Sequence, residues 1–204
     1  MKKLALATAA ILAVSATPAL AQDYDDDNML SPLSGFYAGA IGGFQNGEAE
    51  TDGDDFDIDG AEYGAFVGFK ADTLLDNTVN RFGLGLNGAI EAHYIWSDAD
   101  GSEGGIDAEK DNEWGISFRP GLSILDDVSP FGLNPYGIIG YRNAEFEVDG
   151  DSEDFSGFEL GLGTEVLAYE NFGVRFDYAY TWYEEKSDID PSEHTFRAGV
   201  AYHF

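Results

Sequence analysis

The sequence has no cysteine among its 204 residues. A disulfide framework and a metal site built from thiolates are therefore both excluded. Basic residues are also scarce, since 10 lysines and arginines face 39 acidic residues and the formal net charge is −29. Because nucleic-acid binding depends on lysine and arginine contacts to phosphates, this balance excludes a nucleic-acid partner.

Long apolar runs are lacking too, and the one notable run stands at the start. Residues 4–14 are apolar, follow Lys2 and Lys3, and precede the small-residue pattern of residues 19–21. A helix needs about 20 apolar residues to cross the hydrocarbon core of a membrane, so this run is too short for an anchor. The pattern predicts a signal peptide over residues 1–21.

Two segments follow the predicted cleavage point. We expect residues 22–33 to be a periplasmic lead-in that precedes the folded part. Residues 34–204 have the size of one ordinary domain.

This domain alternates between residue classes with a period of two. In residues 174–182 the even positions are large and apolar or aromatic, whereas the odd positions are small, polar or charged. Such alternation predicts strands and excludes helices. Eight tracts of this kind predict an all-β, eight-stranded antiparallel barrel, and they cover about residues 34–45, 60–70, 82–96, 113–124, 135–147, 155–167, 172–183 and 194–204. In the fifth tract Ile138 and Ile139 fall on opposite faces, so its register stays open.

The small and charged face of these strands suits the inside of a barrel. Eight strands leave an interior just wide enough for side chains, and charges of both signs can pair there. We expect Arg119, Arg175 and Arg197 to pair with Glu91, Glu159 and Asp177, so that a salt-bridge network closes the lumen. The predicted lumen charge network comprises Glu62, Glu91, Arg119, Glu159, Glu165, Arg175, Asp177 and Arg197.

The large apolar face is then expected to meet lipid, which makes the barrel a transmembrane one. Aromatic side chains gather at both ends of the tracts, as in the two interfacial girdles of a membrane barrel. The predicted membrane girdle comprises Phe36, Phe69, Trp96, Trp114, Tyr180, Trp182 and Tyr202.

Acidic residues concentrate in four clusters, residues 46–60, 98–113, 145–154 and 184–193, which hold 25 of the 39 carboxylates. All four fall on one rim of the predicted barrel, so we expect them to be extracellular loops, with both termini periplasmic.

These acidic loops would attract Ca²⁺ or Mg²⁺ loosely, since carboxylate oxygens suit hard cations. Part of the second cluster, Asp98, Asp100, Ser102 and Glu109, resembles an EF-hand loop, but position 6 is Glu103 where glycine is required. No defined metal site is therefore expected, and no cofactor.

Three segments resemble a known family: Gly-Phe-Tyr-Ala-Gly at residues 35–39, Pro-Tyr-Gly at 135–137, and the aromatic ending at 198–204. The chain is similar to the small outer-membrane β-barrels of Gram-negative bacteria, such as the OmpA transmembrane domain, OmpX and the alphaproteobacterial surface-antigen barrels. The resemblance implies the cell outer membrane, with lipid and lipopolysaccharide as neighbours. It also implies an assembly signal read by the barrel-assembly machinery, formed by Phe196, Ala198, Val200, Tyr202 and Phe204. Because the sequence ends at Phe204, we expect no peptidoglycan-binding domain.

The residues give no sign of catalysis. The three histidines, His93, His194 and His203, show no spacing typical of a triad with a nucleophile and an acid. We therefore expect a structural barrel without enzymatic activity. Two alternatives stay open: a small pore that is cation-selective because of its acidic mouth, and a surface adhesin whose extracellular partner the loops do not identify.

Overall fold

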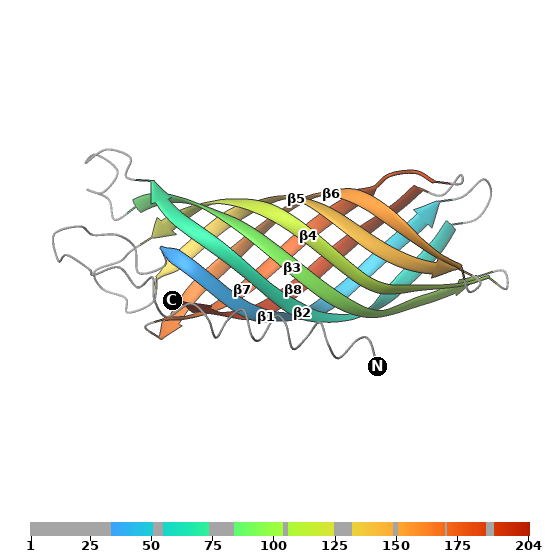
Figure 1. The fold of residues 1–204 in the computed structure, drawn as a ribbon, viewed down its shortest axis with the longest axis horizontal. Coiled ribbons are helices and arrows are strands. Elements are labelled where there is room, and N and C mark those ends of the chain that lie inside the picture. Colours follow the sequence, from blue (N-terminus) through green and yellow to red (C-terminus); the bar gives the residue numbers. More distant parts are fainter. Residues whose placement is uncertain are drawn as a thin grey trace.

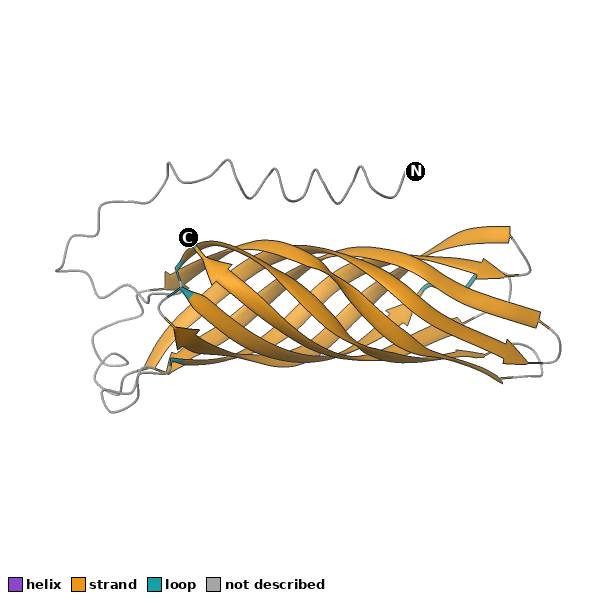
Figure 2. Cartoon of the chain, turned by 90° about the horizontal axis from the view of Figure 1, so that it is seen from below, coloured by secondary structure: helices purple, strands orange, loops and turns teal. Residues whose placement is uncertain are grey.

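The chain folds into a closed barrel of eight antiparallel strands (Figures 1 and 2). This computed structural model describes residues 34–50, 55–73, 84–103, 106–124, 132–148, 151–169, 171–186 and 190–204. The predicted signal peptide and lead-in lie outside the described residues. The strands are β1 (Gly35–Glu50), β2 (Asp55–Thr73), β3 (Leu84–Glu103), β4 (Ile106–Ile124), β5 (Leu133–Val148), β6 (Asp151–Tyr169), β7 (Phe172–Tyr183) and β8 (Asp190–His203).

Each strand pairs with its sequence neighbours, and β8 pairs with β1 to close the sheet. The predicted eight-stranded antiparallel barrel is confirmed. Among the described residues, no helix is long and apolar enough to cross a membrane.

The strands are strongly staggered. A row of paired residues that leaves β1 at Ala38 returns to β1 at Glu48, ten residues further along. The row passes through Val67, Ala92, Ile116, Tyr141, Phe158, Trp182 and Ser192. Such a stagger tilts the strands to the barrel axis by about 35–45° and leaves a bore that side chains fill.

The two ends of the barrel differ, and we name them by their residues. The terminal end holds Gly35 and Phe204, and the Phe204 amide donates to the Phe36 carbonyl over 2.9 Å. The acidic end holds the last pairs of three hairpins, Glu50 with Asp55, Glu103 with Ile106, and Val148 with Asp151. In Figure 1 the letter C marks the terminal end.

The acidic clusters are mostly strand, so the prediction that they form loops is wrong for most of their length. Pairing of β1 with β2 continues through Glu50 and Asp55, inside the first cluster. The reason is that alternation persists there: Ile58 is buried in the lumen, whereas Asp57 and Asp59 on either side are exposed. A high density of carboxylates hid an ordinary in-and-out strand pattern.

The open register of the fifth strand is also settled. Ile138 is 2% exposed and lies in the lumen, whereas Ile139 is 43% exposed on the outer face. The outer face is lined by large apolar side chains all round the barrel, among them Phe69, Ile90, Phe118, Leu162 and Phe176. Apolar residues also enter the bore, where Tyr37, Ile41, Phe66, Ala89, Ile95 and Ala201 form a buried cluster.

The seam between β1 and β8 depends on glycine at one lumen-facing position. A Cβ atom on Gly39 would lie 2.1 Å from the Val200 carbonyl oxygen and 2.3 Å from the Phe66 ring. Neither a paired backbone nor a ring 2% exposed can retreat by that much.

We therefore expect Gly39→Leu to block closure of the barrel, with the refolded fraction reduced by more than half. The heat-dependent shift of the folded band on a denaturing gel measures that fraction. Ala40→Leu is the matched control, because Ala40 is exposed on the outer face and should tolerate the same side chain. Equal refolding of the two variants would contradict the steric argument.

Candidate functional site: the charged lumen

The bore collects most of the positive charge of the chain. The sequence has 10 lysines and arginines, of which Lys2 and Lys3 lie in the predicted signal peptide. Six of the other eight are buried in the lumen: Lys70, Lys110, Arg119, Arg142, Arg175 and Arg197. Seven buried carboxylates accompany them: Glu62, Glu91, Glu113, Glu159, Glu165, Asp177 and Glu193. All eight residues of the predicted lumen charge network are in these two sets.

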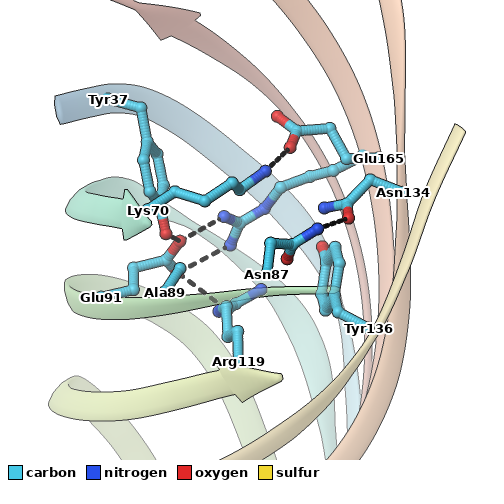
Figure 3. A pocket seen from close by; sticks show the side chains of 10 residues that line it. Tyr37, Lys70, Asn87, Ala89, Glu91, Arg119, Asn134, Tyr136 and Glu165 are labelled. Carbon is cyan, nitrogen blue, oxygen red and sulfur yellow. Dashed lines mark hydrogen bonds and ion pairs between the residues drawn. The ribbon is translucent and has the colours of Figure 1, made fainter. Parts of the chain in front are cut away.

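A central cluster crosses the bore between β3, β4 and β7. Glu91 accepts from Arg119 over 2.7 Å and from both terminal nitrogens of Arg175 over 2.6 and 3.0 Å. Asp177 accepts from Arg119 over 3.0 Å and from Arg175 over 3.1 Å. Two carboxylates thus balance two guanidinium groups. Figure 3 shows Arg119 and Tyr37 converging on Glu91 from opposite sides.

Tyrosines complete this central cluster. The Tyr37 hydroxyl donates to Glu91 over 2.9 Å, and the Tyr136 hydroxyl donates to Asp177. These donors satisfy carboxylate lone pairs that burial would otherwise leave without a partner, which is the condition for keeping charges out of water.

A lower cluster lies toward the terminal end. Lys70 donates to Glu165 over 2.7 Å, and His203 Nε2 lies 2.8 Å from the other oxygen of the same carboxylate. Beside this group the Asn87 amide donates to Ser123 over 2.8 Å. The side-chain amides of Asn87 and Asn134 lie 2.6 Å apart (Figure 3).

An upper cluster lies toward the acidic end and centres on Glu113. This carboxylate accepts from Lys110 over 2.8 Å, and Arg142 and Arg197 each lie 3.2 Å from it. Glu193 binds Lys110 and Arg142 as well, over 2.6 and 3.0 Å. With Glu62 on Arg197 and Glu159 on Arg142, four carboxylates share three cations.

The predicted pairings were right in part. Arg119 and Arg175 pair with Glu91 and Asp177, whereas Arg197 pairs with Glu62 and Glu113 instead. Glu159 pairs with Arg142. The alternation along a strand predicts whether a side chain points into the bore, but not how far along the barrel axis it lies. The stagger of the strands decides which charges meet.

Four members of the upper cluster were missed from the sequence: Lys110, Glu113, Arg142 and Glu193. Glu113 shares the parity of Arg119, and Glu193 that of Arg197, so alternation places both in the lumen, whereas their acidic clusters predict loops. Arg142 lies on the strand whose register was open. Lys110 could not be found by parity, because the register shifts beside it.

An apolar cap covers the upper cluster. Ile58, Ala99, Ala144, Phe146, Phe155 and Tyr183 form a second buried cluster. The Phe146 ring packs edge-on against Phe155 and Tyr183, with centroids 5.5 and 5.8 Å apart. These residues lie in the parts of the strands nearest the acidic end, which we call the acidic extensions. The acidic extensions comprise residues 46–50, 55–60, 97–103, 106–113, 144–148, 151–155, 183 and 190–193, and they close the bore as well as lengthen it.

The predicted girdle residues all point outwards. Phe36, Phe69, Trp114, Trp182 and Tyr202 are exposed on the outer face, and Trp96 and Tyr180 are half-exposed. Neighbouring rings pack together at both ends, as for Phe36 with Phe69 at 5.0 Å and Tyr180 with Trp182 at 4.5 Å between centroids.

The described residues of the EF-hand-like segment lie in strands β3 and β4. Asp100 pairs with Glu109 across β3 and β4, and the side chain of Ser102 lies outside the description. Within the described ranges, no group of three or more histidine or acidic side chains could hold a metal ion.

The histidines are far apart and differ in surroundings. His93 lies in the lumen 3.4 Å from Glu113, and His203 binds Glu165 near the terminal end. His194 is on the outer face, where its Nδ1 lies 2.9 Å from the Tyr178 hydroxyl. No pair of them shares a site in the described part of the chain.

A family model described as the outer membrane protein beta-barrel domain matches residues 6–204. The chain belongs to this family. Its members are outer-membrane β-barrels, so the lumen and outer face described above are those of an outer-membrane barrel. No curated protein matches the sequence.

The structure is similar to those of solved outer-membrane proteins, and the first of these similarities shows a shared fold. Neisserial surface protein A is 16% identical, with a TM-score of 0.52 over 84% of this chain and 98% of that one. Ail of Yersinia pestis is 17% identical, with a TM-score of 0.38 over 83% and 99%. The N-terminal β-barrel domain of OprF from Pseudomonas aeruginosa is 12% identical, with a TM-score of 0.41 over 81% and 99%.

The charge balance of the clusters predicts an order of stabilities. Glu91→Gln leaves two buried arginines with one carboxylate, and we expect it to cost about 3–5 kcal/mol of unfolding free energy. Glu113→Gln should cost about 1–3 kcal/mol, because the upper cluster has one carboxylate in excess. Urea unfolding in lipid vesicles, followed by tryptophan fluorescence, measures these differences.

Glu109→Gln is the control for both variants. Glu109 is exposed on β4, so its substitution should change the free energy by no more than about 0.5 kcal/mol. If Glu91→Gln unfolded like the control, the central cluster would not stabilise the barrel.

Proposed function

We propose that this protein is a structural component of the outer membrane, with a bore sealed by its own side chains. The single observation that carries the proposal is the filling of the lumen. Three charged clusters and an apolar cap follow one another from the terminal end to the acidic end, and every ionic side chain in them is at most 8% exposed. Eight-stranded barrels leave no aqueous channel once side chains occupy them, whereas open porins have 16–18 strands.

The proposal includes an orientation. The acidic end would face the outside of the cell and the terminal end the periplasm, after export by the signal peptide. In support, a strand needs about 9–11 residues to cross a membrane, whereas β3 has 20 and β4 has 19. The excess length lies in the acidic extensions, beyond Trp96 and Trp114, and barrels of this kind project on the outside.

Lipid and lipopolysaccharide would be the immediate partners. The outer face is apolar, and its aromatic residues would sit at the two interfaces. Because most basic residues are paired inside the bore, few positively charged side chains remain at the acidic end to bind anionic headgroups. Loosely held Mg²⁺ or Ca²⁺ would therefore bridge the carboxylates to those headgroups. The barrel-assembly machinery would read Phe196, Ala198, Val200 and Tyr202 of β8 and Phe204, the residue that follows the strand.

We also propose that the protein is not an enzyme. Its buried acids and bases are engaged with one another in ion pairs, and the outer-face His194 is bonded to Tyr178. A catalytic base would need a nucleophile within hydrogen-bond reach and a partner that orients it.

One observation favours a second candidate, a small cation-selective pore. The upper cluster holds four carboxylates against three cations, and the extensions above it are acidic. A path that opened there would attract cations and repel anions.

Single-channel recording of the refolded barrel in a planar bilayer separates the two candidates. We expect no steady current steps from protein whose folded state is shown by its heat-dependent gel shift. Reproducible cation-selective steps, reduced when Glu193 is changed to Gln, would overturn the sealed-barrel proposal and favour the pore.

A further inference from the structure

Lys110 makes an unusual set of contacts at the top of the bore. Its ammonium group is fully buried, and side-chain oxygen atoms from four strands contact it. It lies 2.8 Å from Glu113 on β4 and 2.6 Å from Glu193 on β8. Gln45 of β1 accepts over 3.1 Å, and the Tyr183 hydroxyl of β7 lies 3.5 Å away. The side chain therefore reaches across the bore from one wall to the other.

Two aromatic rings complete the surroundings. The Lys110 nitrogen lies 5.9 Å from the Phe146 ring centroid and 6.0 Å from that of Tyr183. Ring faces attract cations within about 6 Å. We call the four oxygen-bearing side chains Gln45, Glu113, Tyr183 and Glu193, with the ring of Phe146, the Lys110 cage.

A backbone irregularity brings Lys110 into this position. Even-numbered residues of β4 from Trp114 to Leu122 point outwards, yet Lys110 is buried inside. The register of β4 with β3 shifts between Trp96 and Ala99, and its register with β5 shifts between Lys110 and Asn112. Such bulges re-aim a side chain to the other face of a sheet. Without the shift, this lysine would point away from the cage.

We propose that the Lys110 cage is a cation-binding site whose resident cation is the lysine ammonium, and that a neutral residue at position 110 converts it into a Ca²⁺ site. The carboxylate oxygens of Glu113 and Glu193 and the amide oxygen of Gln45 are of the kinds that Ca²⁺ takes in proteins, and the Tyr183 hydroxyl oxygen lies beside them. One oxygen of each carboxylate faces Lys110, and the other faces Arg142. Water would therefore supply the remaining oxygens of the six to eight that Ca²⁺ requires.

Charge selects a divalent cation. The upper cluster has four carboxylates, Glu62, Glu113, Glu159 and Glu193, and three cations. Loss of Lys110 leaves only Arg142 and Arg197 against them, which is a deficit of two positive charges. A buried deficit of this size is costly unless a cation fills it.

The cage has a space beside it that is about the size of one water molecule. This cavity of about 10 Å³ is lined by Gln45, Ile58, Phe146, Tyr183, Pro191 and Glu193 among others. Three of the four oxygen-bearing cage residues therefore border both the lysine and this cavity, at the acidic end of the barrel. In the native chain the tethered ammonium keeps an external cation out of this position.

The test compares Lys110→Met with Lys186→Met, each as refolded protein whose barrel has closed. Lys186 is the matched control, because it also lies near the acidic end but donates to the Asp154 carbonyl outside the cage. Calcium titration calorimetry should show one additional site in Lys110→Met, at least tenfold tighter than any binding by the native or control protein. The double change Lys110→Met with Glu193→Gln should abolish it.

Refolding gives a second readout if Lys110→Met does not close in calcium-free buffer. Closure restored by Ca²⁺, but not by Na⁺ at equal ionic strength, supports the site. Calcium binding equal to that of Lys186→Met, or failure to close with and without Ca²⁺, overturns the proposal. Because these measurements need no membrane current, their outcome is independent of whether the native barrel conducts.

Discussion

Burial of charge inside a narrow bore is the constraint on which this structure depends. Thirteen lysine, arginine, aspartate and glutamate side chains are at most 7% exposed in the lumen, where removal from water is costly for each of them. They persist because each cation meets at least one carboxylate, and hydroxyl donors such as Tyr37 and Tyr136 occupy further lone pairs. Partners come from strands far apart in sequence, so the clusters also hold opposite walls of the barrel together.

This constraint determines where positive and negative charges lie in the molecule. Most basic residues lie in the bore, and the surplus acidic residues lie on the acidic extensions and the outside of the acidic end. The extensions serve the bore in turn, because Ile58, Phe146 and Phe155 close it above the upper cluster. An acidic surface and a paired interior are therefore two consequences of one distribution of side chains.

The fold could be read from the sequence because a barrel imposes a period of two on every strand. Residues 174–182 show that period without exception, and β7 spans the predicted residues 172–183. Strand lengths were less predictable than the number of strands. Asp57 and Asp59 look like loop residues, although Ile58 between them is in the core.

The lumen was predictable as a set of residues but less so as a set of contacts. Glu62, Glu91 and Arg175 lie inside, as their parity required. The partner of Arg197 was not predictable, because the alternation along a strand does not show how far along the barrel axis a side chain lies. The position of Lys110 was not predictable for a different reason. A local shift of register turns its side chain from the outer face into the lumen.

The absence of cysteine allows a direct test of whether paired charges seal the bore. A single cysteine at Thr181, which is 0% exposed inside the barrel, can be compared with one at the exposed Glu109. A small cationic thiol reagent is added to each folded barrel in lipid vesicles. We predict prompt labelling at position 109, and labelling at position 181 only after the barrel is unfolded by heat. Equal labelling rates at the two positions in the folded barrel would contradict a sealed lumen.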